Sequence, residues 1–370
     1  MSNFLLQSLL IPVTAAMILL FRRYAPQLGV VDVPGGRKHH HGDIPLVGGL
    51  AMFGGLAVAA LFAILSDSFL DQHMAFFAAI SLLVLTGFFD DRSGLSPRRR
   101  FVLQAIATLI MVYGADIRLD NFGDLFGFGD VTTGVLAAPI TVFAVLGVIN
   151  AMNMIDGVDG LAGGVALIAL LVFAAFAAAA GMLEQTLLLP LACVIVGFML
   201  FNLRTPWRSH ASVFMGDAGS VLLGFALAWY AVDLAQARDV ITPITAVWIL
   251  GIPLMDTTSL MVRRVIKGRS PFSADREHLH HIIQRAGFTP GQTVWIVYAL
   301  TLLLAAVGVA GWWAGLPEYV MFYAFIALSL LYLYGMLHAW KLMKKLRRLR
   351  NRLLRMRSAP ATVAVEPAHD

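Results

Sequence analysis

Residues 160–180, GLAGGVALIALLVFAAFAAAA, form a run of 21 residues without one charged side chain. A helix needs about 20 mostly apolar residues to cross the hydrocarbon core of a bilayer. The whole chain shares this character, since 59% of its 370 residues are hydrophobic and 13% are charged. Soluble domains are about 45–50% apolar and about 25% charged. A soluble fold has no interior for this much apolar surface, so the sequence predicts a membrane protein.

Apolar runs of this kind occur eleven times, which predicts an all-α polytopic membrane protein with about eleven transmembrane helices. The first run lacks the basic start and the small-residue cleavage site of a signal peptide, so we expect it to remain as a membrane span. The sequence shows no repeat and no second soluble domain. The runs cover residues 4–21, 45–66, 72–89, 101–115, 132–149, 160–180, 183–201, 213–232, 241–260, 292–312 and 318–340.

Lysine and arginine are distributed unevenly between the two sets of loops that eleven spans create. One set of loops, together with the C-terminal tail, carries 25 of the 27 basic residues, and the other set carries only Arg118 and Arg238. Loops on the cytoplasmic side of a membrane are enriched in lysine and arginine. The N-terminus is therefore predicted to lie outside and the C-terminus in the cytoplasm.

The sequence predicts one large unit followed by a basic tail. We expect residues 1–340 to form a membrane-embedded catalytic domain whose active-site loops face the cytoplasm. Residues 341–357 repeat leucine at helical spacing between basic residues, which predicts a basic amphipathic helix on anionic headgroups or a coiled-coil seam. Residues 358–370 are predicted to be disordered. The predicted cytoplasmic loops are 22–44, 90–100, 150–159, 202–217 and 261–291.

Compact clusters of carboxylates lie at the ends of predicted spans on the cytoplasmic side. The third run ends in Asp90–Asp91, residues 150–160 read NAMNMIDGVDG, and residues 214–220 read FMGDAGS. Adjacent carboxylates repel each other unless a cation neutralises them. Carboxylate and amide oxygens are the ligands that Mg²⁺ prefers. The acids of the outer loops are interpreted differently, as residues that only keep these loops solvated. They are Asp67, Asp71, Asp116, Asp120, Asp124 and Asp130.

Two histidine-rich segments lie in the same cytoplasmic loops, RKHHH at 37–41 and DREHLHH at 275–281. No cysteine and no zinc-type spacing accompanies them, so these imidazoles are better suited to bind phosphate and sugar oxygens than a transition metal. Of the three histidines at 39–41, we expect one at most to act. Carboxylates, amides and basic side chains around a metal ion fit phosphoryl transfer, in which catalysis is positioning plus neutralisation of charge.

From Asp32 to about Phe288 the chain resembles the polyprenyl-phosphate N-acetylhexosamine-1-phosphate transferases, most closely the bacterial WecA type. The resemblance implies that GlcNAc-1-phosphate passes from UDP-GlcNAc to undecaprenyl phosphate, giving GlcNAc-diphosphoundecaprenol and UMP. Such a product starts O-antigen or common-antigen (lipopolysaccharide-type) assembly at the cytoplasmic face of the bacterial inner membrane. The motifs are RKHHHGDIPLVGG, FFDDRSGLSPRRRFVLQ, NAMNMIDGVDGLAGG, FMGDAGS and SPFSADREHLHHIIQRAGFT.

By position in these motifs, the resemblance implies a role for each candidate residue. The implied catalytic residues are Asp90, Asp91, Asp156, Asp159 and His278. The implied ligands of Mg²⁺, which Mn²⁺ can replace, are Asp217 and Asn153. The implied nucleotide-sugar-binding residues are Phe214, Met154, Lys38, His280, His281 and Arg264. The implied lipid-phosphate-binding residues are Arg99, Arg100 and His40.

Several alternatives stay open at this point. The donor can be another UDP-N-acetylhexosamine, or UDP-MurNAc-pentapeptide as in the related peptidoglycan enzyme, although that enzyme typically has ten spans and three consecutive histidines. A secondary transporter would place its ionisable residues near the membrane midplane, on repeats. Direct attack by the lipid phosphate and a covalent intermediate are both compatible with the sequence, with either Asp90 or Asp91 as the base. The expected partners are UDP-GlcNAc, undecaprenyl phosphate and the bilayer, with homo-oligomers left open and no nucleic acid.

Overall fold

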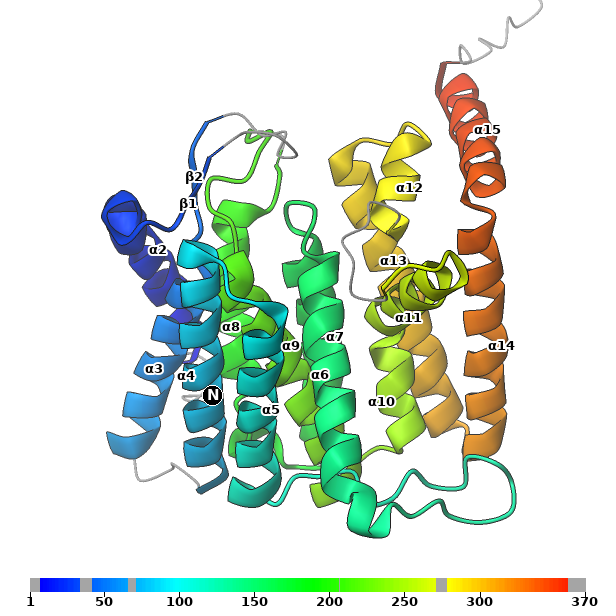
Figure 1. Cartoon of the computed structure of the whole chain (residues 1–370), viewed down its shortest axis with the longest axis horizontal. Coiled ribbons are helices and arrows are strands. Elements are labelled where there is room, and N and C mark those ends of the chain that lie inside the picture. The colour runs from blue at the N-terminus through cyan, green and yellow to red at the C-terminus, as the bar shows by residue number, and fades with distance from the viewer. Residues whose placement is uncertain (1–6, 34–41, 66–70, 206, 271–277, 359–370) are drawn as a thin grey trace, which may run out of the picture.

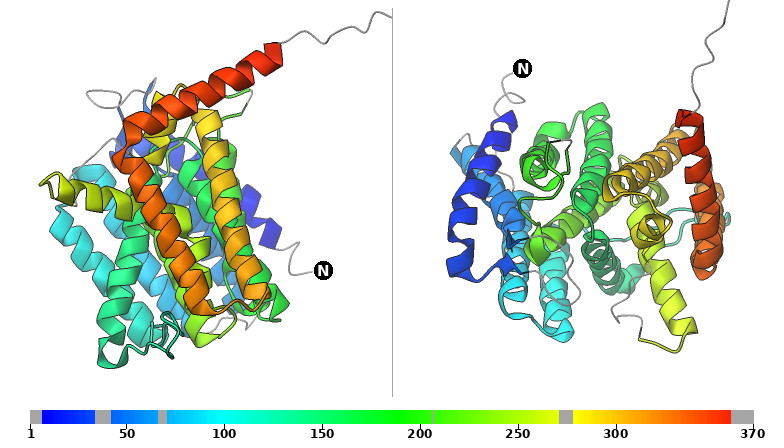
Figure 2. Two further views of the ribbon diagram at one scale, coloured as in Figure 1. Left: turned by 90° about the vertical axis from the view of Figure 1, so that its right-hand side faces the viewer. Right: turned by 90° about the horizontal axis from the view of Figure 1, so that it is seen from above.

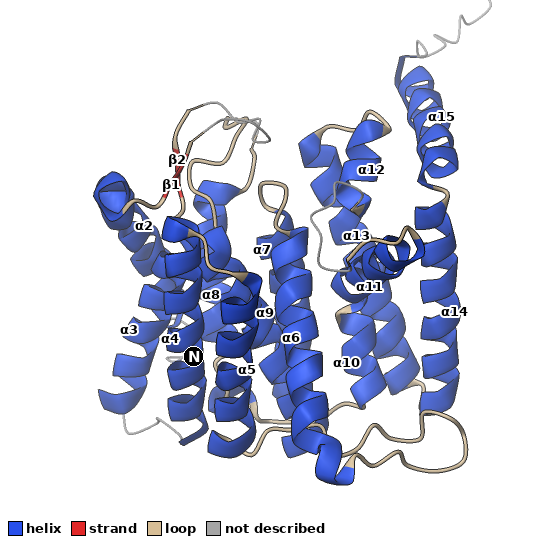
Figure 3. Cartoon of the chain, viewed as in Figure 1, coloured by secondary structure: helices blue, strands red, loops and turns tan. Residues whose placement is uncertain are grey.

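The computed structural model describes residues 7–33, 42–65, 71–205, 207–270 and 278–358, and most of them are helical (Figures 1 and 3). Within these ranges the strands are a two-residue antiparallel pair, β1 (Val31–Asp32) and β2 (Ile44–Pro45). The predicted all-α class is thus confirmed. The helices are α2 Leu10–Leu28, α3 Gly48–Leu65, α4 Asp71–Ser93, α5 Pro97–Gly114, α6 Ala137–Ile155, α7 Leu161–Ala179, α8 Leu188–Asn202, α9 Gly216–Val232, α10 Pro243–Ile249, α11 Gly251–Ile266, α12 Leu279–Arg285, α13 Pro290–Trp313, α14 Glu318–Leu337 and α15 Ala339–Ser358.

Seven of the described helical segments are long and apolar enough to cross a membrane, or eight if the bent pair α10–α11 counts as one. The predicted polytopic membrane protein is therefore confirmed, and the count of eleven stays a prediction. Three further runs correspond to helices that are not counted among these segments. Two of these helices, α2 and α5, carry arginines, and the third, α8, is only 15 residues long. The seven segments are Gly48–Leu65, Asp71–Ser93, Gly134–Ile155, Leu161–Ala179, Gly216–Ala237, Pro290–Trp313 and Glu318–Leu337.

The ninth run, 241–260, is not one straight helix, and whether it forms one span stays a prediction. The chain forms two helices there, α10 and α11, whose axes differ by 81°. Pro253 lies in the first turn of α11, where it has no N–H to continue the hydrogen bonding of α10 and its ring crowds the carbonyl four residues earlier. In Figure 2 (left) α11 points sideways out of the bundle.

The two ends of the bundle differ. The β1–β2 pair, α12 and α15 lie at one end, and the loop 115–133 lies at the other (Figure 1). Helices α4 and α6 end, and α9 begins, at the end that holds α12. The predicted carboxylate clusters therefore meet at one end of the bundle. Helix α15 covers the residues predicted as a basic amphipathic helix and crosses this same end (Figure 2).

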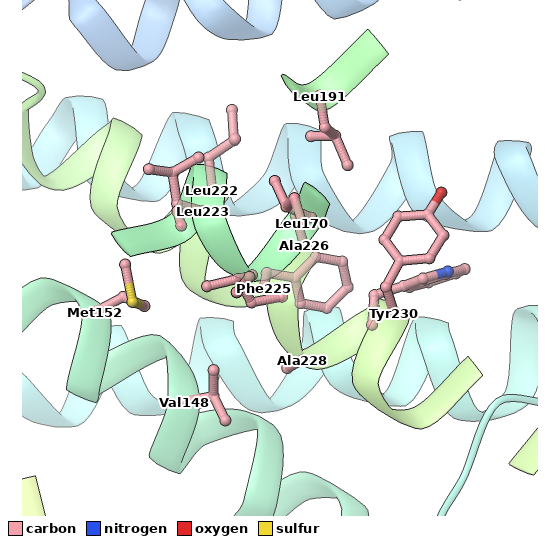
Figure 4. Close-up of a cluster of buried hydrophobic side chains, with 14 of the residues drawn as sticks. Val148, Met152, Leu170, Leu191, Leu222, Leu223, Phe225, Ala226, Ala228 and Tyr230 are labelled. Atoms are coloured by element: carbon pink, nitrogen blue, oxygen red, sulfur yellow. The ribbon is translucent and has the colours of Figure 1, made fainter. Parts of the chain in front are cut away.

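Helix α9 is the centre of the core. All of its membrane-length segment is buried inside the protein, and it packs against α3, α4, α6, α7 and α10. Phe225 and Trp229 of α9 contact Phe76 of α4, with ring centroids 6.1 and 5.2 Å apart. Figure 4 shows the buried side chains around Phe225, where Val148 and Met152 of α6 approach α9 from a second side. A helix buried on every side holds a fixed position, and the residues at its first turn are fixed with it.

Small residues let neighbouring helices reach the start of α9. A Cβ atom added to Gly87 of α4 would lie 2.3 Å from the Cα atom of Ala218, and one added to Gly49 of α3 would lie 2.2 Å from the amide nitrogen of Gly219. Both contacts are with backbone, which cannot move aside as a side chain can. The backbones of α3 and α4 therefore touch α9 directly, as small residues allow in membrane helices.

This contact predicts that Gly87→Ala destabilises the protein. The new methyl group forces α4 away from α9, and overpacking of this kind costs about 1–3 kcal/mol. The matched control is Gly147→Ala in α6, where an added Cβ meets nothing within 4 Å. We expect a lower unfolding temperature in detergent for Gly87→Ala alone. Equal unfolding temperatures for the two variants would contradict the proposed close contact.

Candidate active site

A cavity of about 580 Å³ lies at the end of the bundle where α4 and α6 end and α9 begins. Its walls come from five segments that are far apart in the sequence. Six of the eight acids and amides at the wall are candidates that the sequence predicted. The lining residues are Asp32, Leu46, Asp90, Asp91, Asn153, Asp156, Gly157, Val158, Asp159, Asn202, Phe214, Met215, Gly216 and Asp217.

Asp91 binds the first turn of α9. Its carboxylate accepts the backbone N–H of Asp217 at 2.8 Å and that of Ala218 at 3.3 Å. The first N–H groups of a helix have no partner within the helix, and the helix dipole favours a negative charge there. Gly216 has a φ of +70°, and an added Cβ would lie 2.5 Å from an Asp91 oxygen, so glycine is required.

Asp90 and Asp217 face each other across the cavity wall. Asp90 accepts a hydrogen bond from Arg100 at 2.9 Å and the backbone N–H of Leu95 at 2.6 Å, and its carboxyl group lies within hydrogen-bonding reach of that of Asp217. Asn153 donates its side-chain N–H to Asp217 at 2.6 Å and to Ser220 at 2.9 Å. This leaves the Asn153 carbonyl oxygen for a ligand.

The loop after α6 supplies two more acids in different environments. Asp159 accepts a hydrogen bond from Arg204 at 2.8 Å and the backbone N–H of Ala211 at 3.0 Å. Asp156 ends α6 and lines the same cavity. Burial, followed by the nearby charges of Asp217 and Asp159, raises the pKa of Asp156 to about 7. Proton or cation binding at this carboxyl group is therefore favoured near neutral pH.

The donor set fits a magnesium ion. Asp90, Asp91, Asp156 and Asp217 offer oxygen atoms only, and the closeness of Asp90 to Asp217 is relieved when a cation binds between like charges. Among the described residues, no three acidic or histidine side chains already form a metal cage. Mg²⁺ usually takes one or two carboxylates and completes its shell with water and substrate phosphates. Asp217 and Asn153, the ligands predicted from the motifs, would hold such an ion together with substrate phosphates.

The histidines form a second cluster beside the carboxylates. The His278 and His280 rings stack 5.4 Å apart, and those of His280 and His281 lie 4.2 Å apart. A Cβ added to Gly157, at the cavity wall, would lie 2.7 Å from Nε2 of His280. The cluster therefore reaches the loop that carries Asp156 and Asp159.

His280 is the neutral member of this cluster. It is 2% exposed, and burial, helped by His281 and His278, lowers its pKa to about 3. Neither ring nitrogen has a hydrogen-bond partner among the described residues. Buried polar atoms without a partner are costly, so these nitrogens are open to a hydrogen-bond partner that the described residues do not supply.

Some predicted residues do not reach the cavity wall. Met154 lies half-buried on α6, and Arg264 is 2% exposed near the end of α11; neither lines the cavity. Arg99 is exposed at the start of α5, and Arg100 is already bound to Asp90. Lys38 and His40 lie outside the described residues.

The structure adds three polar residues that the sequence analysis did not assign to the site. Asp32 of β1 and Asn202 of α8 line the cavity. Asn202 accepts the backbone N–H of Gly160 at 2.7 Å and donates to the carbonyl of Val213 at 2.9 Å, so it joins two active-site loops. Asp256 of α11 binds His278 at 2.9 Å. The sequence could have indicated Asp256, because it is a lone acid inside an apolar run, and such acids are rare unless they are functional.

A larger cavity, of about 680 Å³, lies at the opposite end of the bundle. It is lined by acids of the loops that the sequence predicts to lie outside, and two of them, Asp116 and Asp120, form ion pairs with Arg118 at 2.9 and 3.0 Å. Arg118 and these acids are exposed. We therefore consider the smaller cavity the candidate site, because carboxylates and two amides line it and the histidine cluster lies against its wall at Gly157.

Comparisons with known proteins identify the class. Residues 73–235 match the family of glycosyl transferases called family 4, and this segment holds every carboxylate of the cavity except Asp32. The fold and site are those of a polytopic membrane protein of this class.

Individual relatives are similar along nearly the whole chain. Proteins named undecaprenyl-phosphate alpha-N-acetylglucosaminyl 1-phosphate transferase occur in Salmonella typhi (38% identical, covering 93% of this chain and 94% of the relative) and in Escherichia coli K12 (37%, 93% and 94%). One in Haemophilus influenzae is 36% identical over 92% of this chain and 96% of its own length. The chain belongs to this family of polyprenyl-phosphate sugar-1-phosphate transferases, and the resemblance drawn from its motifs is confirmed.

The raised pKa of Asp156 predicts a stability effect that depends on pH. The folded-state pKa is about 7, above an ordinary value of about 3.9, so the folded protein holds this proton more tightly than the unfolded chain does. Wild type therefore loses stability between about pH 4 and 7, and the loss persists above pH 7. Asp156→Asn removes this loss. Because the side chain borders an open cavity where water shields it, we expect a gain of about 1–2 kcal/mol.

The measurement is the unfolding temperature in detergent without divalent cations, at pH 4.5 and pH 8. Asp156→Asn should exceed wild type clearly at pH 8 and little at pH 4.5. The same difference at both pH values would contradict the raised pKa.

Proposed function

We propose that this protein transfers GlcNAc-1-phosphate from UDP-GlcNAc to undecaprenyl phosphate, giving GlcNAc-diphosphoundecaprenol and UMP. The proposal is supported by one observation above all: carboxylates from α4, α6 and α9 line one cavity of about 580 Å³, and a histidine cluster lies against Gly157 of its wall. Relatives 37–38% identical over 93% of the chain carry the name of that activity. The product is the starting lipid for O-antigen or common-antigen type polysaccharides.

In the proposed reaction, an oxygen of the lipid phosphate forms a bond to the phosphorus next to the sugar. The bond from that phosphorus to the bridging oxygen breaks, and UMP leaves with the electron pair. We propose that Asp217 and Asn153 would hold Mg²⁺, which Mn²⁺ can replace, and that this ion would supply neutralisation of the pyrophosphate charge. Asp90 or Asp91 takes a proton from the lipid phosphate, and Arg100 stabilises the ionised form of Asp90.

Other residues of the chain bind and orient the two substrates in this proposal. The aromatic ring of Phe214, at the cavity wall, stacks on uracil, and the main chain of Met154 contributes nearby. Asp156 and Asp159 organise the nucleotide end. His278, His280 and His281 bind phosphate and sugar oxygens, and Arg99 with Arg100 attracts the lipid phosphate. Lys38, His40 and Arg264 remain predicted substrate contacts.

We also propose that the protein lies in the bacterial inner membrane with this cavity facing the cytoplasm. The asymmetry of 25 basic residues against two supports this orientation, with eleven spans, the N-terminus outside and the C-terminus inside. The donor is a water-soluble nucleotide sugar, so it has to reach the site from an aqueous compartment that contains it.

A donor panel tests the function. Purified protein, undecaprenyl phosphate and Mg²⁺ are combined with UDP-GlcNAc, with other UDP-N-acetylhexosamines and with UDP-MurNAc-pentapeptide. The lipid product is identified by its mass, and UMP is measured. UDP-GlcNAc should give the fastest turnover. A faster reaction with another donor would change the assigned sugar, and no UMP from any donor would contradict the transferase and favour a transporter.

The proposed metal role predicts that Asp217→Asn loses at least about 100-fold in turnover, since a metal ion contributes several kcal/mol to the stabilisation of charge in the transition state. The residual activity should need more Mg²⁺. The matched control is Asp130→Asn, which changes an exposed acid of the outer loop. A magnesium titration of wild type and both variants decides the question. An unchanged magnesium requirement in active Asp217→Asn would contradict its role as a ligand.

The proposed orientation predicts how single cysteines react. The one native cysteine, Cys193, is first replaced by alanine. Ser209→Cys lies in an exposed loop near the cavity, and Val135→Cys replaces a residue that is 97% exposed before α6 at the other end. In intact cells, a membrane-impermeant maleimide should label Val135→Cys and leave Ser209→Cys unlabelled until the membrane is opened. The reverse pattern would contradict the orientation and place the cavity outside.

A further inference from the structure

Asp256 is a buried acid that forms three hydrogen bonds to groups from separate parts of the chain. It is 3% exposed. Its carboxylate accepts Nδ1–H of His278 at 2.9 Å, the backbone N–H of Leu279 at 3.1 Å and the hydroxyl of Tyr332 at 2.7 Å. These partners come from the start of α12 and from α14. The acid itself is on α11, just beyond the 81° bend.

This set of contacts continues to the cavity. The ring of His278 stacks on that of His280 with an interplanar angle of 10°, and His280 lies against Gly157 at the cavity wall. A hydrogen bond at Nδ1 fixes both the orientation of an imidazole and its tautomer. It leaves Nε2, on the far edge of the His278 ring, as the nitrogen that can contact a substrate.

We propose that Asp256 is a positioning residue for His278, and that Tyr332 of α14 fixes Asp256 in turn. This inference rests on the proposed function, because it assumes that His278 contacts the phosphate or sugar of the donor. Asp256 would then act on the reaction only through the imidazole. Histidines that bind metals are fixed in the same way by a carboxylate at the other ring nitrogen.

The burial of Asp256 favours this role over a general contribution to stability. An isolated carboxylate in a membrane protein is costly and generally marks a functional site. Three donors compensate for the cost here. A carboxylate that only joined three helices could be replaced by apolar residues of similar size without loss, whereas a carboxylate that orients an imidazole cannot.

A double-mutant cycle tests the inference with UDP-GlcNAc and undecaprenyl phosphate. His278→Ala should lower kcat by about 10²–10³-fold, the scale for removing one group that stabilises charge. Asp256→Asn should lower kcat by about 10–100-fold, with little change in the KM for UDP-GlcNAc. Tyr332→Phe removes one hydroxyl and should lower kcat by less than Asp256→Asn does.

The double variant decides between the two roles. If Asp256 acts through His278, adding Asp256→Asn to His278→Ala changes kcat by less than about threefold, because no imidazole is left to orient. If Asp256 is purely structural, the two losses multiply, and this outcome would overturn the inference. The matched control is Asp233→Asn, which alters another buried carboxylate, paired with Arg238 at 2.7 Å at the opposite end of the bundle. It should leave kcat unchanged.

A second measurement needs no turnover. Protein labelled with ¹⁵N in its histidines is compared by solid-state NMR with His278→Ala, which assigns the His278 signals. Asp256→Asn, and to a lesser degree Tyr332→Phe, should shift the Nδ1 signal of His278. An unchanged signal in a folded Asp256→Asn variant would overturn the inference. A wild-type protein that makes no product from UDP-GlcNAc would instead refute the proposed function, and the NMR result would still decide the position of His278.

Discussion

The hydrogen bonds from the first turn of α9 to the carboxylate of Asp91 are the contact on which the site depends. Helix α9 is buried along a membrane-length stretch, and its first N–H groups have no partner within the helix, so a side chain that accepts them fixes the start of the helix. Asp91 does so with both oxygens. The charge of Asp91 is stabilised by the same helix end that it satisfies. The two adjacent acids therefore have different partners: Asp91 binds the backbone of α9, whereas Asp90 is bound by Arg100 and faces Asp217.

Close helix packing makes this contact possible. Asp91 reaches the start of α9 only because Gly87, one helical turn before it, lets the two backbones touch. Gly49 does the same from α3, and its own N–H donates to the carbonyl of Met215 at 2.9 Å. The helices of the core therefore place the acids directly, without a long loop between packing and chemistry. Residues on rigid elements keep their geometry better than residues on loops.

Much of the fold and of the carboxylate centre could be predicted from the sequence, for a physical reason. Apolar runs long enough for a bilayer are also long enough to be helices, and polar residues at their ends have to lie at the membrane surface. The bend between α10 and α11 could not be found in this way, because an apolar run has the same composition whether its helix is straight or bent. Pro253 is the residue that could have indicated the bend. Arg264 is buried and does not line the cavity, which its place in a basic segment did not indicate, and its role as a substrate contact stays a prediction.

The site combines a carboxylate centre with a cluster of largely buried histidines, and these halves are held by different means. The carboxylates are fixed by the core helices α4, α6 and α9. The histidine cluster sits at the start of the seven-residue helix α12, which is too short to hold its own geometry without tertiary contacts. Asp256 and Tyr332 supply such contacts from α11 and α14. The bend in α11 is then part of the site, since the direction in which α11 leaves the bundle sets where Asp256 meets the start of α12.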